Sequence, residues 1–348
     1  MATEKSTPNS TVSKIKQSRK KEISVRNLAD GIFKGDKAVL AKAITLVESS
    51  KQEHFEKANS VIEECLSKPN ESIRIGITGV PGVGKSTFIE VLGKTLTSLN
   101  KKVAVLAVDP TSSLSKGSIL GDKTRMETLA KDPNAFIRPS PSGESLGGVA
   151  RKTRESIILC EAAGYDVILV ETVGVGQSET VVHSMVDFFL LLKLSGAGDE
   201  LQGIKRGIVE MADAIAINKA DGSNLKKAKL AKAEFSRALH LYPPKENGWI
   251  PKVLSCSATE NTGIREILEM IQEFVKVTRE NGHFELNRKN QNKNWFVQTV
   301  DEQLKLFFHQ KKAYKRIQQK MLKAIEENKI SPFYAAQVLL DDLTKELK

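Results

Sequence analysis

A glycine-rich run at residues 79–86, which reads GVPGVGKS, restricts the possible folds of this chain more than any other segment. A β-type run from Ile73 to Thr78 precedes it, and a helical pattern from Lys85 to Leu99 follows it. Between a strand and a helix, the spacing GxxxxGKS predicts a loop whose backbone amides surround a polyphosphate. Residues without a Cβ allow close approach of the phosphate oxygens, and the helix start adds partial positive charge. The sequence therefore predicts the α/β fold of a P-loop NTPase.

Short β-type runs alternate with helical patterns between residues 71 and 282, which is typical of a mainly parallel sheet flanked by helices. The expected strands are Ile73 to Thr78, Val103 to Asp109, Ala135 to Arg138, Asp166 to Glu171, Phe188 to Leu194, Ala214 to Asn218 and Lys252 to Ser255. The clearest helices are expected at Lys85 to Leu99, Val149 to Ala163, Leu225 to Leu241 and Ile264 to Thr278. We assign residues 71–282 to one nucleotide-binding domain.

Helical segments are expected on both sides of this domain. At residues 23–70, apolar side chains recur at helical spacing after the cap Asp36, which predicts an N-terminal helical layer. At residues 283–348, a helical pattern from about Asn292 to Asn328 would be about 55 Å long, more than one compact domain covers. We interpret it as a dimerisation arm that reaches a second subunit, with a packing extension of the same monomer as the alternative. A final short helix should begin after the cap Ser331, with Pro332 at its first position.

Basic residues exceed acidic residues by 53 to 42, so the formal charge is +11 and would suit a polyanion. Part of the excess lies in residues 1–22, which we interpret as a flexible basic tail rather than an RNA-binding or membrane-binding element. The three cysteines, Cys65, Cys160 and Cys256, form no CxxC pair, which favours a reducing compartment. No apolar run approaches the roughly 18 residues of a membrane span, and no secretory signal opens the chain. We therefore expect a cytoplasmic protein with no nucleic-acid and no membrane partner.

The glycine-rich loop should hold the phosphates of a nucleotide together with Mg²⁺. Lys85 is expected to place its ammonium between the β- and γ-phosphates, and the hydroxyl of Ser86 is expected to ligate Mg²⁺. The residues expected to bind the nucleotide here are Gly79, Val80, Pro81, Gly82, Val83, Gly84, Lys85, Ser86 and Thr87.

A second pattern, NKAD at residues 218–221, follows the apolar strand Ala214 to Ile217 and predicts the base site. The carboxylate of Asp221 can accept hydrogen bonds from the N1 and N2 donors of guanine, whereas adenine has no matching donor pair. Asn218 and Lys219 complete the motif, which favours GTP and GDP over adenine nucleotides. Ser257 and Ala258 follow the next strand, where a second loop is expected to reach the guanine oxygen; a simple strand-end turn is the alternative.

Three carboxylates are candidates for holding Mg²⁺ beside Ser86. Asp109 and Asp122 lie where switch loops are expected, with turn or helix-capping roles as their alternatives. Glu171 ends a strand and begins ExxG, and the amide of Gly174 can meet the γ-phosphate. Because Mg²⁺ keeps few protein ligands, Ser86 and one or two of these carboxylates form the expected set. Val175 stands where small signalling GTPases carry a water-positioning glutamine, which predicts slow hydrolysis that a partner changes.

Several longer stretches contain these residues: GITGVPGVGKST (76–87), VDPTSS (108–113), GSILGDKTRM (117–126), ETVGVGQSE (171–179), GAGDELQGIKRGI (196–208) and NKADG (218–222). Together they resemble the methylmalonyl-CoA mutase-associated GTPases, the MeaB/ArgK family, over roughly residues 70–280.

The resemblance implies a homodimeric G-protein chaperone that binds the adenosylcobalamin-dependent mutase, gates delivery of its cofactor and protects it from inactivation. It also implies that Asp109, Asp122 and Glu171 are the Mg²⁺ and switch carboxylates. An additional switch would lie at residues 196–205, where Lys205 would carry the nucleotide signal to the partner.

Two other functions share parts of this pattern. A nickel-insertion metallochaperone GTPase would need a Cys/His metal site, but the five histidines fall at no ligand-like spacing with the cysteines. A kinase acting on a transport protein would need a phosphoryl-transfer set, but no HRD or DFG motif is present. The mutase chaperone remains the favoured hypothesis.

Overall fold

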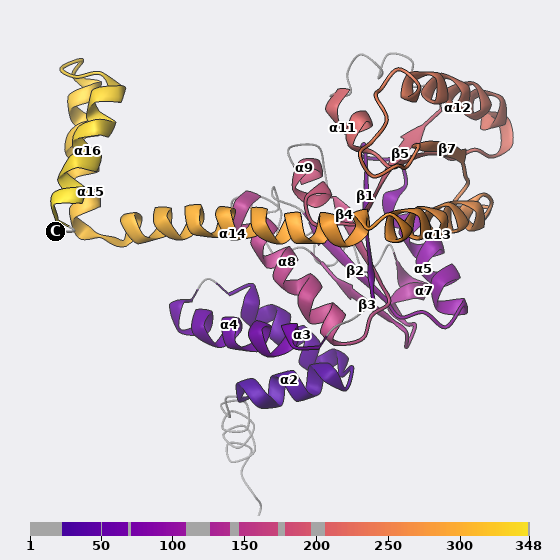
Figure 1. Cartoon of the computed structure of the whole chain (residues 1–348), viewed down its shortest axis with the longest axis horizontal. Helices are drawn as coiled ribbons and strands as arrows, with labels where there is room; N and C mark the ends of the chain where they lie inside the picture. The colour runs from indigo at the N-terminus through magenta and orange to yellow at the C-terminus, as the bar shows by residue number, and fades with distance from the viewer. Residues whose placement is uncertain are drawn as a thin grey trace, which may run out of the picture. The chain divides into compact units, whose positions relative to one another are not determined.

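The computed structural model describes residues 23–49, 51–68, 71–108, 126–139, 146–172, 178–195 and 206–346 and contains a parallel sheet (Figure 1). Within these residues the sheet has seven strands in the order β3-β2-β4-β1-β5-β6-β7, and all neighbours pair in parallel. The strands are β1 (Ile73–Gly79), β2 (Val103–Val108), β3 (Ala135–Arg138), β4 (Val167–Thr172), β5 (Phe188–Leu194), β6 (Ala214–Asn218) and β7 (Lys252–Ser255).

The strand predictions are confirmed, because β3, β5, β6 and β7 have the expected bounds, β1 is one residue longer at its end, and β4 is shifted by one residue at each end. The expected last residue of β2, Asp109, lies outside the described residues. Every residue of β2 and of β4 is buried. Strands covered on both faces read as continuous apolar runs, and turn residues bound these runs, so the sequence located them well.

Helices cover both faces of the sheet (Figure 1). Successive side chains of β5 show this, because Leu190 and Leu192 join one core cluster and Leu191 joins another. The first cluster packs against α5 (Lys85–Ser98), α7 (Glu127–Ala130) and α13 (Ile264–Glu280). The second packs against α11 (Arg206–Met211) and α12 (Leu225–Leu239), and the same face carries α8 (Leu146–Ala162) and α9 (Ser178–His183).

The N-terminal helical layer is present as α2 (Val25–Phe33), α3 (Lys37–Val47) and α4 (Gln52–Leu66). The Asp36 carboxylate caps α3 as predicted, since it accepts bonds from the backbone amides of Ala38 at 2.8 Å and Val39 at 3.1 Å. The three helices pack on one another and on α8. An ion pair between Arg138 and Glu48 joins this layer to the end of β3.

The C-terminal helices are α14 (His283–Gln310), α15 (Lys312–Glu326) and α16 (Pro332–Glu346). The helical pattern expected from about Asn292 to Asn328 is divided between α14 and α15, because the backbone is extended at Lys311, with φ −72° and ψ 128°. Ring contacts support this break, with the His309 and Tyr314 centroids 4.7 Å apart and the Lys311 ammonium 4.6 Å from the Phe307 ring. The cap at Ser331 is confirmed, since its Oγ accepts a bond from the Tyr334 amide at 3.1 Å.

The chain divides into two compact units, residues 1–288 and 289–348, and α15 and α16 pack on each other within the second. No helix in the described part of the chain is long and apolar enough to cross a membrane.

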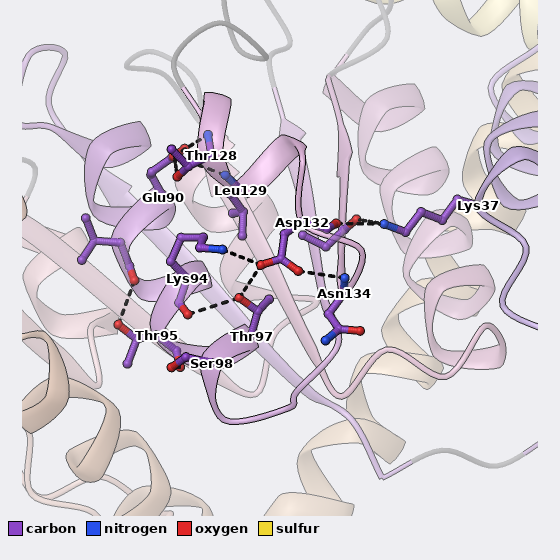
Figure 2. A network of polar contacts seen from close by, with 12 residues as sticks. Lys37, Glu90, Lys94, Thr95, Thr97, Ser98, Thr128, Leu129, Asp132 and Asn134 are labelled. Carbon is purple, nitrogen blue, oxygen red and sulfur yellow. Dashed lines mark hydrogen bonds and ion pairs between the residues drawn. The ribbon is translucent and has the colours of Figure 1, made fainter.

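A polar network holds the turn before β3 between two helices (Figure 2). The carboxylate of Asp132 accepts bonds from the Lys94 ammonium at 2.6 Å and from the Thr97 hydroxyl at 2.8 Å, both on α5. From α3, the ammonium of Lys37 donates to the backbone oxygens of Asp132 at 3.1 Å and Ala135 at 2.5 Å. The turn therefore connects the N-terminal layer to α5, the helix that follows the glycine-rich loop.

We expect Asp132→Asn to lower the free energy of unfolding by about 1–2 kcal/mol at pH 7, because it removes a charge-assisted bond to a half-exposed lysine. The hydrogen bond from Lys94 is the main cause that lowers the pKa of Asp132 from its ordinary 3.8 to about 2. A lowered carboxyl pKa stabilises the fold above the unfolded value, and this contribution is lost as the pH falls through about 2. Urea unfolding should show a constant difference from the wild type between pH 7 and about pH 5, and this difference should shrink as the pH falls below about 4. Asp30→Asn, at an exposed position, is the control, and equal midpoints for Asp132→Asn would contradict the prediction.

Candidate functional site

The predicted nucleotide-binding residues gather at one edge of the sheet, because parallel strands all end there. Gly79 ends β1, Glu171 lies at the end of β4, and Asn218 ends β6. Ser257 follows the end of β7. Strands that are far apart in the sequence thus bring the phosphate motif and the base motif together.

The glycine-rich loop adopts backbone conformations that require glycine. Gly84, immediately before α5, has φ +92°, and a Cβ added there would lie 2.8 Å from Nδ2 of Asn218. A Cβ on Gly79 would lie 2.6 Å from the backbone oxygen of Leu192. The N-cap of α5 is Gly84, which has no side chain with which to cap the helix. Its first amides are therefore positioned to bind an anion together with the loop.

Lys85 begins α5, and its side chain folds back over the loop. The ammonium donates to the backbone oxygens of Gly79 at 2.7 Å and Val80 at 3.3 Å, and the residue is only 9% exposed. The neighbouring Val83 is fully buried, whereas Pro81 and Thr87 are exposed. The cation of Lys85 is thus fixed inside the loop, where it can meet phosphate oxygens.

Ser86 and Glu171 meet at the same edge, where the Ser86 hydroxyl donates to Oε1 of Glu171 at 3.2 Å. Glu171 is buried, at 3% exposure, and the neighbouring Thr172 joins β4 to β1 by donating from its hydroxyl to that of Thr78 at 2.9 Å. A hydroxyl and a carboxylate oxygen next to a phosphate loop are the donors that Mg²⁺ prefers, so these residues fit the predicted ion. The other predicted ligands, Asp109 and Asp122, lie outside the described residues, as do Gly174 and Lys205.

Asn218 and Lys219 bind the glycine-rich loop directly. Nδ2 of Asn218 donates to the backbone oxygen of Val83 at 2.8 Å, while its Oδ1 accepts from the amide of Ala258 at 3.3 Å. Lys219, with φ +56°, donates from its ammonium to the backbone oxygen of Gly82 at 2.9 Å. Asn218 therefore connects the glycine-rich loop with the loop after β7, which we expected to reach the guanine oxygen.

A buried thiol completes this contact. Burial raises the pKa of Cys256 to about 12, so the thiol stays protonated. Its Sγ lies 3.6 Å from Oδ1 of Asn218, where it acts as a weak donor.

The carboxylate of Asp221 is oriented by the loop after β7. Its Oδ2 accepts a bond from the buried hydroxyl of Ser257, and the hydroxyl of Thr259 lies 3.3 Å from the same oxygen. The amide of Ala220 donates to the backbone oxygen of Cys256 at 3.0 Å, which holds the two loops together. Sequence reasoning did not identify Thr259. The one feature of the sequence that could have indicated Thr259 is a second hydroxyl group two positions after Ser257.

We expect Gly84→Ala to weaken GDP binding about 10-fold or more, because the new methyl group must be accommodated at a strained positive φ. It also meets Nδ2 of Asn218 at 2.8 Å and so displaces the contact between the two motifs. Calorimetric titration with GDP measures the effect. Gly164→Ala is a matched control, since Gly164 has φ +82° with nothing within 4 Å of the added Cβ. It should lower stability and leave GDP affinity unchanged, and an equal loss of affinity in both variants would contradict the local explanation.

Comparison with known proteins agrees with this geometry. The family described as methylmalonyl-CoA mutase-associated GTPase MeaB matches residues 40–313. A probable GTPase of Mycobacterium tuberculosis is 46% identical over 318 residues, which cover 91% of this chain and 95% of that protein. The mitochondrial methylmalonic aciduria type A homolog of Mus musculus is 44% identical over 333 residues, 93% of this chain and 80% of that protein.

A solved structure described as an LAO/AO transport system kinase is also similar. It aligns with a TM-score of 0.72 and 37% identity, and the match covers 92% of this chain and 97% of that one. The resemblance predicted from the motifs is therefore confirmed, and the chain has the P-loop NTPase fold. By its sequence and its structure, this chain belongs to the methylmalonyl-CoA mutase-associated GTPase family, MeaB.

Proposed function

We propose that this chain is a GTP-hydrolysing G-protein chaperone of adenosylcobalamin-dependent methylmalonyl-CoA mutase, gating cofactor delivery and protecting the mutase. One observation carries the nucleotide part of this proposal. The buried cation of Lys85 and the oriented carboxylate of Asp221 lie on loops that Asn218 and Lys219 join by hydrogen bonds. A phosphate-binding group and a guanine-reading group thus belong to one site. The name of the family supports the mutase as the partner.

In this proposal the loop amides and Lys85 bind the phosphates of GTP, and Asp221 accepts the two guanine donors. Ser86 and Glu171 hold Mg²⁺ together with Asp109, Asp122 or both. When bound, the ion neutralises the charge that develops on the phosphates during hydrolysis. The chain itself orients the nucleotide and excludes other bases.

We further propose that hydrolysis is slow until the partner binds, because Val175 replaces the usual water-positioning glutamine. Gly174 would contact the γ-phosphate, and Lys205 would carry the state of the nucleotide to the mutase. For the location we propose the cytoplasm, with no nucleic acid and no membrane as a partner. The cysteines support a reducing compartment, since Cys65, Cys160 and Cys256 are all buried and free.

A homodimer is the proposed assembly, with the C-terminal helices as the arm. These helices carry large apolar side chains on their surface: Phe296 at 71% exposure, Phe307 at 48% and Phe333 at 84%. Exposed aromatic groups at this density favour contact with another protein surface. Burying a phenylalanine contributes about 1.5–3 kcal/mol, so Phe296→Ser should raise the dimer dissociation constant at least about 10-fold.

Analytical ultracentrifugation over a concentration series measures that dissociation constant. Lys320→Ser, at an exposed position on α15, is the control and should leave it unchanged. A wild-type protein that remains monomeric at high concentration would refute the dimer.

The decisive experiment on function uses nucleotide-stripped full-length protein. Calorimetry with GDP and ADP tests guanine selectivity, and release of phosphate from γ-labelled GTP, with and without mutase, tests partner-dependent hydrolysis. A pull-down of mutase in GDP and in a non-hydrolysable GTP analogue tests association. If GTP is hydrolysed but no mutase associates in either state, the chaperone assignment fails and the GTPase assignment survives.

The same labelled GTP separates hydrolysis from the kinase alternative, since a kinase would leave the label on a protein. Nothing in the described ranges supports the nickel-insertion alternative, since no group of three or more His, Cys, Asp or Glu side chains there could hold a metal ion.

A further inference from the structure

The loop after β7 directs two hydroxyl groups at one oxygen of the base-reading carboxylate. Ser257 donates from Oγ to Oδ2 of Asp221, and Oγ1 of Thr259 lies 3.3 Å from Oδ2 and 3.0 Å from Oγ of Ser257. No group among the described residues forms a hydrogen bond with the other oxygen of Asp221, Oδ1. Asp221 is therefore held from one side only.

The protons of this group can be counted. Each hydroxyl has one proton to donate. Ser257 uses its proton on Asp221 and accepts a bond from the amide of Glu260 at 3.2 Å. Thr259 can donate directly to Oδ2, or to Oγ of Ser257, which then polarises the bond from Ser257 to Asp221. In both arrangements the hydroxyl of Thr259 strengthens the hold on Oδ2.

The backbone places Thr259 in this position. Ser257 and Thr262 exchange two backbone hydrogen bonds of 3.0 Å, which close the turn between them. Gly263 has φ +74°, and a Cβ there would lie 2.3 Å from the backbone oxygen of Ser255, so the turn is tightly packed at its end. Thr259 itself is exposed at the tip of this turn. Removing its hydroxyl should therefore leave the fold intact.

We propose that Thr259 is a positioning residue for base specificity, holding the plane of the Asp221 carboxylate so that both oxygens face guanine. This inference rests on the proposed guanine-nucleotide function. The last torsion of an aspartate is broad, so one hydrogen bond restrains the carboxylate less than two do. Guanine needs both oxygens, for its N1 and its N2 donors, whereas hypoxanthine has only the N1 donor and tolerates rotation. Loss of the hydroxyl therefore weakens GDP more than IDP.

The test is calorimetric titration of the nucleotide-stripped full chain with GDP, IDP and ADP in the presence of Mg²⁺. Thr259→Val removes the hydroxyl and keeps the shape, while Thr259→Ser keeps the hydroxyl. Thr262→Val makes the same change in the same turn, at a residue that contacts Ser257 through its backbone. Thermal unfolding of each variant shows whether the fold is affected.

We expect Thr259→Val to weaken GDP binding roughly 3- to 10-fold, with a smaller loss for IDP, so that the ratio of the two affinities falls. The GDP affinities of Thr259→Ser and Thr262→Val should lie within about 2-fold of the wild-type affinity, because both variants keep a hydroxyl group at position 259. Wild-type affinities for both nucleotides in Thr259→Val would overturn this inference alone. An equal loss for GDP, IDP and ADP would also overturn it, since a structural defect does not distinguish bases. A wild-type protein that binds ADP as well as GDP would overturn the proposed function and this inference together.

Discussion

Lys85→Ala is expected to weaken GTP binding about 30- to 100-fold, because the variant loses a charge-assisted contact to the phosphates in a largely buried loop. At saturating GTP, hydrolysis should fall about 100- to 1,000-fold, since the ammonium also stabilises charge that develops during phosphoryl transfer. The position of the ammonium explains the size of the effect. It lies 2.7 Å from the backbone oxygen of Gly79, and Lys85 is only 9% exposed. In the alanine variant, water therefore cannot fully compensate for the lost ammonium group.

Calorimetry and phosphate release measure both effects on the same preparation. Lys101→Ala is the control, because its side chain is 53% exposed and pairs with Asp166 at 3.7 Å. It should leave binding and turnover unchanged. If Lys85→Ala binds GTP like the wild type, the phosphate site has been placed wrongly.

Arg288→Leu is expected to lower the free energy of unfolding by about 3 kcal/mol, because it leaves a buried carboxylate without its main partner. The guanidinium donates to both oxygens of Asp187, at 2.8 and 2.6 Å, and to the backbone oxygen of Ser72 at 2.8 Å. The Asp187 side chain is 1% exposed. Burial opposes the charge of Arg288, but the hydrogen bonds to Asp187 and the charges of Asp187 and Glu161 raise its pKa above the ordinary value.

Urea unfolding at pH 7 measures this loss, and Lys289→Leu, at the next and exposed position of α14, should show little change. Arg288→Leu combined with Asp187→Asn should recover part of the loss, because the buried charge is then removed together with its partner. A double variant no more stable than Arg288→Leu would show that packing of the arginine stem, rather than the unpaired charge, causes the loss.

The sequence predicted the sheet better than the C-terminal helices. The strands β2, β4 and β6 are short apolar runs buried at every residue, so their limits coincide with a change in residue type. The break at Lys311 has no such signal, since neither proline nor glycine occurs between Phe307 and Tyr314. The contacts at the break, between the rings of His309 and Tyr314 and between Lys311 and the ring of Phe307, are visible only in the structure.

In the candidate site, too, the sequence predicted the motifs but not the contacts of individual side chains. The order of GVPGVGKS and NKAD along the chain was sufficient to predict a phosphate site, a guanine-reading site and their common edge, because parallel strands end on one side. From the sequence, Asn218 was assigned to the base site as part of NKAD. In the structure it bonds to Val83, 135 residues away, and Thr259 reaches Asp221 from a different strand end.

Motifs and apolar runs were therefore readable from the chain alone, since they depend on residue type and local spacing. Hydrogen-bond partners far apart in the sequence could not be predicted in this way. Arg288, for example, bonds to the backbone of Ser72, 216 residues away. The register of the strands and the packing of helices on them bring such groups together, and many equally polar pairs would satisfy the same sequence pattern. The fold and the class of the site thus followed from local physical chemistry. The contacts of Asp221 and Arg288 depend on how the strands assemble into the sheet.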